Sequence, residues 1–129
     1  AELEERFIVS AGLRGVPGTA LEQIDPTRAA AHHERRTTQP VGASAGCTCK
    51  NPELCGAGKL IDDLGLKGME AGPARVSDIH GNFIINTGGA TARDILSLAS
   101  QIQQRALEEK GGQLELEVKV IGEAAPLPL

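Results

Sequence analysis

The sequence predicts an α+β domain in which a sheet with one solvent-exposed face packs against helices in two layers. Thr91 and Asp94 form a capping box at the start of a segment whose apolar residues recur at helical spacing. Residues 114–120 alternate strictly between apolar and charged side chains, which is typical of a half-buried strand. Strands and helices follow one another without a regular βαβ repeat, so we expect a mixed sheet.

The N-terminal part of the chain predicts one strand and one helix. Residues 6–14 have an apolar core of β-forming residues and are followed by glycines and a proline, which indicates a strand and a turn. Asp25 and Pro26 offer an N-cap and a proline at the first helical position, so we expect a short helix from there to Arg36. Residues 40–58 contain four glycines and two prolines, and this density predicts a loop.

The rest of the chain predicts two helices and two strands. Apolar spacing indicates a helix over 57–64, and a short apolar run indicates a strand over 82–86. The capped helix is expected over 91–110, and the alternating strand follows it. A glycine follows each of the two helices, as expected for a helix C-terminus.

The composition excludes several classes of function. A net charge of −4 and a pI near 5.4 argue against a nucleic-acid partner. The chain has no Trp or Tyr and only two Phe, so it lacks the residues for base stacking or for an aromatic-lined flavin pocket. No apolar run reaches the roughly 20 residues that cross a bilayer, and the first residues do not resemble a signal peptide. We therefore expect a cytoplasmic protein with no membrane partner.

Three cysteines lie within nine positions, and two interpretations of this loop remain open from the residues alone. Cys47, Cys49 and Cys55 could bind a metal together with a histidine, although paired C-x2-4-C ligands are absent. Alternatively, the glycines let a ligand approach the backbone of a catalytic loop, in which Lys50 and Asn51 hold phosphate oxygens. The odd number of cysteines does not indicate a secreted disulfide framework.

Two further groups of polar residues have both structural and functional interpretations. His80 and Asn82 flank Gly81 at the start of a predicted strand, either as ordinary loop residues or as side chains that face a site. Glu115 and Glu117 share the polar face of the last predicted strand, and taken alone they indicate a solvated face. The residues by themselves assign neither group a role.

Five sequence blocks resemble a known family. In chain order they are RRTTQP, SAGCTCKNP, AGKLIDDLGLKG, VSDIHGNFIINTGGATARDIL and LELEVKVIGE. Together, from Arg35 to Glu123, they are similar to the C-terminal part of the UDP-N-acetylenolpyruvoylglucosamine reductase family, MurB. The resemblance implies an enzyme of peptidoglycan synthesis, in which NADPH acts through FAD to reduce UDP-N-acetylglucosamine enolpyruvate to UDP-N-acetylmuramate.

The resemblance also implies roles for individual residues. Cys47 occupies the Ser or Cys position of the family's loop and is expected to be the general acid. Glu117 stands before Val in the final block and is expected to stabilise or protonate the intermediate. Gln39 stands where some members have Lys, and Cys49 replaces the usual aromatic residue. The other expected contacts are substrate-binding Lys50, Asn51, His80, Asn82 and Gln39, and cofactor-binding Gly46, with no metal ligand.

The resemblance divides the chain into three parts. Residues 1–34 are expected to be the end of a preceding FAD-binding region with a connecting helix, 35–123 the substrate domain, and 124–129 a frayed tail. The chain begins without Met and runs at once into a strand-like stretch, so we expect a piece of a larger protein that lacks the FAD-binding half. This piece alone is expected to hold neither cofactor and to be inactive. The alternative is a small Cys/His metal-binding or interaction module.

Overall fold

The computed structural model describes residues 9–15, 18, 20–53 and 55–122, and the chain divides into two compact units, 1–32 and 33–129. The strand predicted over 6–14 is wrong for its described part, because residues 9–14 adopt no strand. Val9 and Leu13 are 95% and 98% exposed, so within the described part of the chain no segment packs against them as a sheet partner would. Residues 6–8 of that prediction, and the predicted tail, lie outside the described residues.

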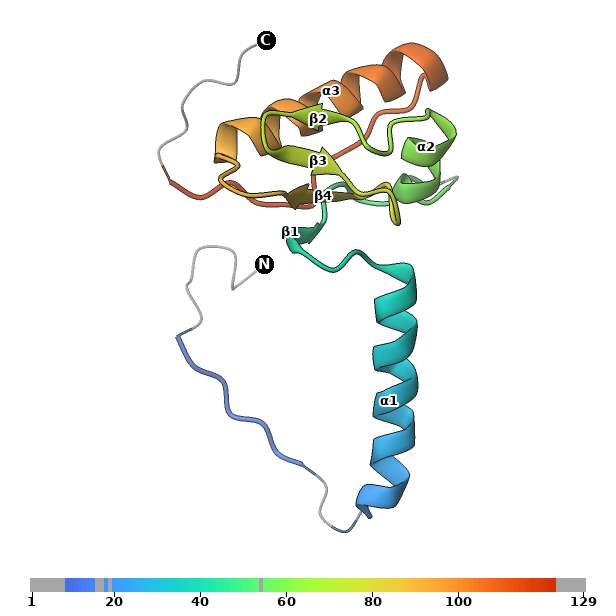
Figure 1. Cartoon of the computed structure of the whole chain (residues 1–129), viewed down its shortest axis with the longest axis vertical. Coiled ribbons are helices and arrows are strands. Elements are labelled where there is room, and N and C mark those ends of the chain that lie inside the picture. The colour runs from blue at the N-terminus through green and yellow to red at the C-terminus, as the bar shows by residue number, and fades with distance from the viewer. Residues whose placement is uncertain (1–8, 16–17, 19, 54, 123–129) are drawn as a thin grey trace. The chain divides into compact units, whose positions relative to one another are not determined.

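Helix α1, Leu21–Thr38, is longer than predicted at both ends (Figure 1). It begins before Asp25 and carries Pro26 inside it, so the predicted start is wrong. A proline this close to the start removes one early hydrogen bond, which the remaining turns of the helix tolerate. The helix ends two residues before Pro40, where the hydroxyl of Thr38 donates to Glu34 O at 2.8 Å.

The sheet contains four antiparallel strands in the order β1-β4-β3-β2. The α+β class is confirmed, and the sheet is antiparallel where we expected a mixed one. The strands are β1 Ala43–Cys47, β2 Glu70–Ala71, β3 Ala74–Val76 and β4 Phe83–Asn86. The sequence predicted β4 correctly but missed the β2–β3 hairpin, whose strands have only two and three residues. Strands this short leave no alternating pattern to detect.

Strand β1 corrects the prediction of a continuous loop over 40–58. It is an edge strand and pairs only with β4, through Ala43 opposite Asn86 and Cys47 opposite Phe83. The register shifts between Ser44 and Cys47, and Gly46 within this irregularity has a φ of +86°. A bulge in an edge strand accommodates a glycine that would weaken the centre of a sheet.

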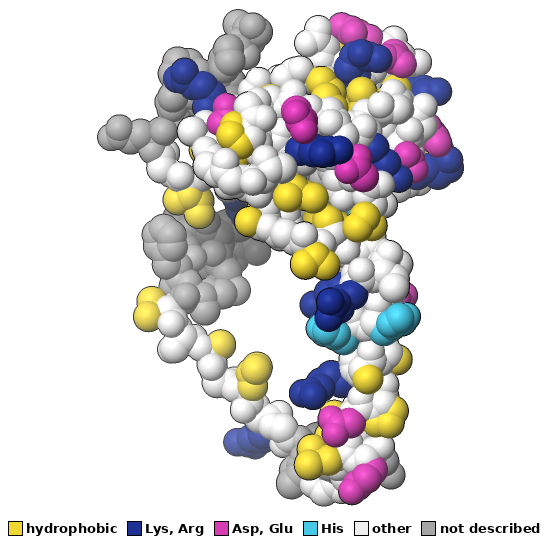
Figure 2. All heavy atoms as spheres, viewed as in Figure 1, with side chains coloured by type: hydrophobic (Ala, Val, Ile, Leu, Met, Phe, Trp, Pro, Cys, Tyr) yellow, Lys and Arg dark blue, Asp and Glu magenta, His cyan; other side chains and the backbone are white. Residues whose placement is uncertain are grey.

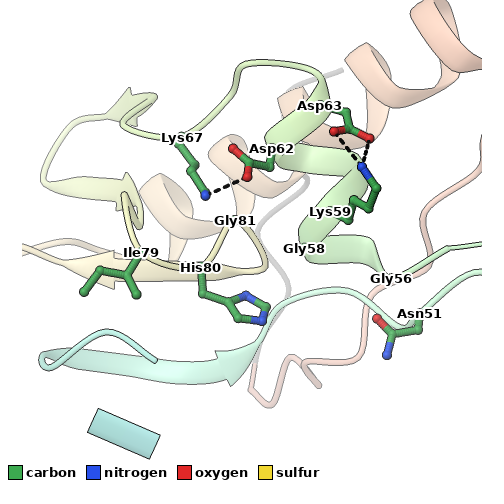
Figure 3. Close-up of a pocket in the computed structure, with 10 residues that line it drawn as sticks. All are labelled: Asn51, Gly56, Gly58, Lys59, Asp62, Asp63, Lys67, Ile79, His80 and Gly81. Atoms are coloured by element: carbon green, nitrogen blue, oxygen red, sulfur yellow. Dashed lines mark hydrogen bonds and ion pairs between the residues drawn. The ribbon is translucent and has the colours of Figure 1, made fainter. Parts of the chain in front are cut away.

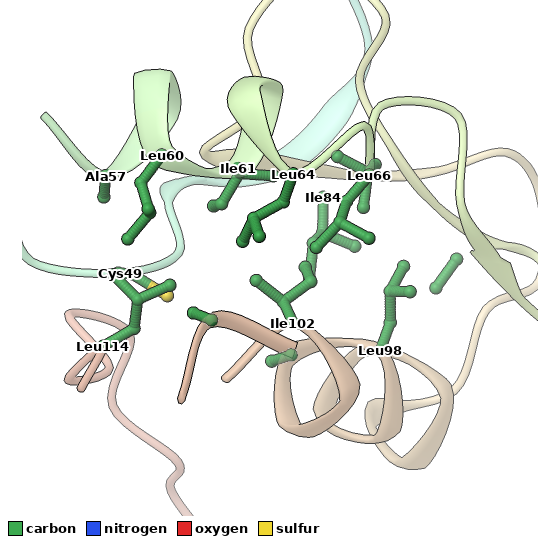
Figure 4. Close-up of a cluster of buried hydrophobic side chains, with 14 residues drawn as sticks. Cys49, Ala57, Leu60, Ile61, Leu64, Leu66, Ile84, Leu98, Ile102 and Leu114 are labelled. Carbon is green, nitrogen blue, oxygen red and sulfur yellow. The ribbon is translucent and has the colours of Figure 1, made fainter. Parts of the chain in front are cut away.

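The hydrophobic core lies between the sheet and two helices, α2 Ala57–Asp63 and α3 Ala92–Lys110 (Figure 4). Both predicted helices are confirmed. The capping box of α3 is present: Asp94 N donates to Thr91 Oγ1, and the Asp94 carboxylate accepts from Thr91 N. These hydrogen bonds from Thr91 lower the pKa of the Asp94 carboxyl group. Fully or nearly fully buried side chains of the two helices are Ala57, Ile61, Leu98, Ala99, Ile102 and Ala106.

The strand predicted over 114–120 is wrong, because this segment forms only one isolated bridge, between Leu116 and Cys49. At the start of the segment, the apolar residues of the alternating pattern do face the core: Leu114 is buried and Leu116 is half-buried. Val120 is 58% exposed, however. Among the described residues, the backbone-to-backbone hydrogen bonds of this segment go only to the short stretch 48–50, so no regular ladder develops.

Candidate active site

The predicted catalytic loop is attached to the start of β4 through Asn82. Asn82 O accepts a hydrogen bond from Thr48 N at 2.8 Å. The Asn82 side chain then pairs with both backbone groups of Cys49: Oδ1 accepts from Cys49 N at 2.8 Å, and Nδ2 donates to Cys49 O at 2.7 Å. Asn82 is only 2% exposed. These three bonds hold the backbone that directly follows Cys47.

The C-terminal segment binds the other side of the same stretch. Glu117 N donates to Thr48 O at 2.9 Å, and Lys50 N donates to Glu115 O at 2.8 Å. The Lys50 ammonium also forms an ion pair with the Glu115 carboxylate, and both side chains are largely exposed. Lys50 and Glu117 are far apart in the sequence. The structure brings the segment that carries Glu117 alongside the stretch that contains Lys50.

The same arrangement brings Cys47 and Glu117 close enough to interact electrostatically. Burial raises the pKa of the Cys47 thiol, and the charge of Glu117 raises it further, while a hydrogen bond with the Asn82 side chain lowers it. The Cys47 residue is nevertheless exposed at the surface. The outcome is an accessible thiol that stays protonated at neutral pH.

Cys49 differs from Cys47 in its surroundings, although only one residue separates them. It is fully buried and belongs to the hydrophobic core. Burial raises the pKa of its thiol to about 11, with further contributions from the charges of Cys47 and Glu117. Cys49 therefore acts here as a small apolar core residue, which is a physical reason for its place in a position where an aromatic residue was expected.

A pocket of about 550 Å³ lies beside this loop, at the start of α2 (Figure 3). Asn51 and His80, two predicted substrate contacts, both line it. Asn51 Oδ1 accepts from Ala57 N at 3.0 Å, so this side chain also supports the start of α2. Two lysines line the pocket, and each is paired with an aspartate: Lys59 with Asp63, and Lys67 with Asp62.

His80 is held in place from three sides. Its Nδ1 accepts a hydrogen bond from Asn82 N at 3.2 Å, and its ring packs edge-to-face against Phe83, with 4.9 Å between the ring centroids. Gly58 lies against the third side, where an added Cβ would come within 2.6 Å of His80 Cε1. Close packing between α2 and the turn before β4 therefore requires glycine at position 58. No local pattern in the sequence indicates this contact.

Within the described part of the chain, the Gln39 side chain makes no hydrogen bond with the rest of the site, and Gly46 has no side chain to make one. Gln39 follows the end of α1 and is exposed, and its backbone N–H donates to Arg35 O at 2.9 Å. Gly46 is half-buried in the irregular part of β1. An added Cβ there would meet no atom within 4 Å, so the space in front of Gly46 is open.

The described residues contain no group of three His, Cys, Asp or Glu side chains arranged to hold a metal ion. None of the helices described is long and apolar enough to cross a membrane. Figure 2 shows positive and negative side chains interspersed on the face of the sheet and its helices that is turned toward the viewer. In the same unit of the chain, Arg75 pairs with Glu70 and Asp78. Such mixed charge produces no strongly basic surface on that face.

Residues 37–121 match the family model of the UDP-N-acetylenolpyruvoylglucosamine reductase C-terminal domain, MurB_C. The chain belongs to this family. The UDP-N-acetylenolpyruvoylglucosamine reductase of Desulfosudis oleivorans is 47% identical to it over 111 residues, which cover 82% of this chain and 36% of that protein. The corresponding protein of Prochlorococcus marinus is 45% identical over 117 residues, 90% of this chain and 40% of that protein.

A solved MurB structure has the same fold. The crystal structure of UDP-N-acetylenolpyruvylglucosamine reductase (MurB) from Thermus caldophilus matches this chain with a TM-score of 0.62 and 45% sequence identity. The match covers 76% of this chain and 34% of that one. The chain thus has the MurB C-terminal fold, and it spans 34–40% of the length of these three MurB proteins.

Proposed function

We propose that this chain is the substrate-binding C-terminal domain of a cytoplasmic reductase that converts UDP-N-acetylglucosamine enolpyruvate to UDP-N-acetylmuramate in peptidoglycan synthesis. Membership of the MurB family supports the reaction class. The observation that carries the proposal is the hydrogen bond from Glu117 N to the carbonyl oxygen of Thr48, which joins the segment of Glu117 to the residue that follows the accessible Cys47 thiol. In this arrangement the charge of Glu117 adds to burial in raising the pKa of Cys47. FAD and NADPH are proposed cofactors of the complete protein, whose FAD-binding half is missing here.

Cys47 is the proposed proton donor. Bound FAD, once reduced by NADPH, would supply the hydride that adds to the β-carbon of the enolpyruvyl group. The α-carbon then carries a developing negative charge next to a carboxylate and needs a proton. The Cys47 S–H bond breaks as the new C–H bond forms, and a thiolate remains. Because burial and Glu117 disfavour this thiolate, it regains a proton from solvent and the donor is restored.

Gly46 fits the close approach of a flat cofactor. Its φ of +86° favours a residue without a side chain at this position, and the space in front of it is open to a ligand. We propose that Gly46 lies against FAD in the complete protein, next to the proton donor. The rest of the FAD site is assigned to residues outside this chain, because the chain has no Trp or Tyr and only two Phe.

The substrate's diphosphate and sugar are proposed to bind beside the Cys47 loop. The exposed ammonium group of Lys50 can leave its ion pair with Glu115 and bind a phosphate oxygen instead. Asn51 has its Oδ1 engaged with Ala57 N, which leaves the Nδ2 donors to face a ligand. His80 lines the same pocket, and Gln39 is proposed as a more distant contact.

The proposed division of the protein follows the same reasoning. Residues 35–123 form the proposed substrate domain. Residues 1–34 are proposed to end the FAD-binding region with its connecting helix, and 124–129 to form a tail. We propose that the chain alone binds no cofactor and has no reductase activity, because hydride transfer requires the missing half.

The test uses the complete protein that contains this chain, loaded with FAD. We expect NADPH oxidation that depends on UDP-N-acetylglucosamine enolpyruvate, with UDP-N-acetylmuramate as the product identified by mass spectrometry. Cys47→Ala should slow product formation by at least about 100-fold, whereas Cys55→Ala, which removes another exposed thiol of the same segment, should leave the rate unchanged. Failure of the complete wild-type protein to form this product, or turnover by the 129-residue chain alone, would overturn the proposal.

A further inference from the structure

Asn82 is a buried amide whose side-chain bonds lead to a segment 33 residues earlier in the sequence. One side-chain atom accepts from Cys49 N and the other donates to Cys49 O, at 2.8 and 2.7 Å. This pair of bonds has the pattern by which two residues face each other in an antiparallel ladder. The Asn82 side chain therefore takes the place that a neighbouring strand would occupy beside Cys49.

The turn before Asn82 fixes the position of this amide. Ser77 is 1% exposed, and its hydroxyl oxygen accepts from two backbone N–H groups of the turn, one of which is that of His80. His80 Nδ1 in turn accepts from Asn82 N. Between them, Gly81 packs so tightly that an added Cβ would lie 2.8 Å from Gly58 O. These contacts hold the backbone of Asn82 in place, and they are separate from the bonds of its side chain to Cys49.

Thr48 connects this amide to the acidic residue of the site. Its N–H donates to Asn82 O, and its carbonyl oxygen accepts from Glu117 N at 2.9 Å. The single residue that follows Cys47 is therefore bound on one side by Asn82 and on the other by Glu117. Any shift of this backbone moves the Cys47 thiol relative to the Glu117 carboxylate.

We propose that Asn82 is a positioning residue, whose side-chain clamp on Cys49 fixes the backbone after Cys47 and so keeps this thiol beside Glu117. The inference rests on the proposed function, in which Cys47 donates the proton. It assigns Asn82 a role different from the substrate contact expected from the family resemblance. This side chain is 98% buried, and its oxygen and its nitrogen are both bonded to Cys49. It also interacts with the Cys47 thiol, so it is poorly placed to meet a ligand.

The first test separates positioning from substrate binding by stopped-flow measurements on the complete, FAD-loaded protein. In Asn82→Ala, flavin reduction by NADPH should be unchanged, because it does not use the α-carbon proton. Reoxidation at saturating substrate should slow by about 10- to 100-fold, the typical cost of misplacing a reacting group. The substrate Kd should stay within about twofold of the wild type. A raised Kd with an unchanged limiting reoxidation rate would identify a direct substrate contact and overturn the proposal.

Asn82→Asp provides a second variant of the same size and shape. A protonated carboxylic acid can accept from Cys49 N and donate to Cys49 O, as the amide does, whereas a carboxylate cannot donate. We therefore expect reoxidation in Asn82→Asp, as a ratio to the wild type at the same pH, to recover as the pH falls. The ratio for Asn82→Ala should stay flat. A flat ratio in Asn82→Asp, or an equal recovery in both variants, would contradict the clamp.

Asn86→Ala is the matched control for general loss of stability. Asn86 closes the other end of β4 and also bonds to two backbone groups, at Gly88 and Ala90. Asn86→Ala should leave flavin reoxidation unchanged. If Asn86→Ala slows reoxidation as much as Asn82→Ala, the effect is merely structural and the proposal fails.

Alkylation of Cys49, resolved by peptide mass spectrometry under native conditions, tests the clamp without any activity. Cys49 is fully buried, so its labelling reports local opening of this segment. Asn82→Ala should label Cys49 about tenfold faster than Asn86→Ala does, since only the first variant frees its backbone. Equal labelling would overturn the clamp. Unequal labelling in a protein that forms no UDP-N-acetylmuramate would support the clamp while refuting the proposed function.

Discussion

An asparagine side chain closes each end of strand β4, but the two asparagines bond to different kinds of partner. Asn86 accepts from the N–H groups of Gly88 and Ala90, two and four residues ahead, at 2.9 and 3.0 Å. Asn82 pairs with Cys49, 33 residues earlier in the sequence, and is buried. The first asparagine forms a local turn. The second joins two distant segments and thereby shapes the candidate site, so similar chemistry serves two different purposes at the two ends of one strand.

Removing each asparagine side chain in turn should show most clearly how the two ends of β4 differ in their contribution to stability. Asn82→Ala leaves the N–H and C=O of Cys49 buried without a partner, and should lower the free energy of unfolding by about 3 kcal/mol. Asn86→Ala releases N–H groups in a more exposed turn, where water can replace the amide, and should cost about 1 kcal/mol. Urea denaturation measures both values. Equal losses would show that the two ends do not differ.

The Asn82 end should also be sensitive to alkaline pH. Burial raises the pKa of Cys49 to about 11 in the folded protein, from an ordinary value of 9.0. The folded state therefore binds this proton more tightly than the unfolded state. The resulting stability is fully present below pH 9 and is lost as the pH rises to about 11, by up to about 2–3 kcal/mol at 1.36 kcal/mol per pKa unit.

Two cysteine variants check this pH dependence in urea unfolding across that range. Cys49→Ala should flatten the profile, because the titrating group is gone. Cys55→Ala removes an exposed thiol and should keep the slope of the parent protein. A slope that survives unchanged in Cys49→Ala would assign the effect to another group.

Beyond Asn86, the chain leads into α3 through its capping box, and this end should behave as an ordinary local structure. Thr91→Ala should cost about 1 kcal/mol, since it removes the side-chain acceptor for Asp94 N at the first turn. Thr91→Ser keeps the hydroxyl and should recover most of the loss. Thermal or urea unfolding measures both, and no recovery in Thr91→Ser would point to the methyl group instead of the cap.

The smallest effect is expected from the ion pair beside the Asn82 end. Lys50 and Glu115 are paired through exposed side chains, so Lys50→Met should change the free energy of unfolding by less than about 0.5 kcal/mol. Lys59→Met, which breaks another exposed pair, serves as the control in the same urea experiment. A loss well above that of the control would mean that the Lys50 pair helps to hold the loop.

The sequence predicted those elements whose signals are local. Helix α3 has a capping box, a regular apolar face and a terminal glycine, all between Thr91 and Gly111, and α2 has the same apolar spacing on a smaller scale. Strand β4 is a continuous apolar run. Each of these patterns stabilises its element before any distant contact forms, and for that reason each could be recognised.

The remaining elements depend on contacts that the sequence does not reveal. Strand β1 is rich in small residues and exists because β4 offers it an edge. Residues 114–120 have a clear strand pattern but find only the short stretch 48–50 to pair with. In the candidate site, Cys47 and Glu117 were chosen by resemblance, whereas the link between them through Thr48 required the folded chain. The burial of Cys49 and the clamp by Asn82 have no local signature.

The most direct measurement of the central claim compares Cys47→Ala and Cys47→Ser in the two half-reactions of the complete, FAD-loaded protein. Flavin reduction by NADPH should be unchanged in both variants. Reoxidation by UDP-N-acetylglucosamine enolpyruvate should fall by at least about 100-fold in Cys47→Ala, the usual contribution of a general acid, and less in Cys47→Ser, which keeps a proton to donate. Equal loss in both half-reactions, or reoxidation at the wild-type rate in Cys47→Ala, would contradict the assignment of Cys47 as the proton donor.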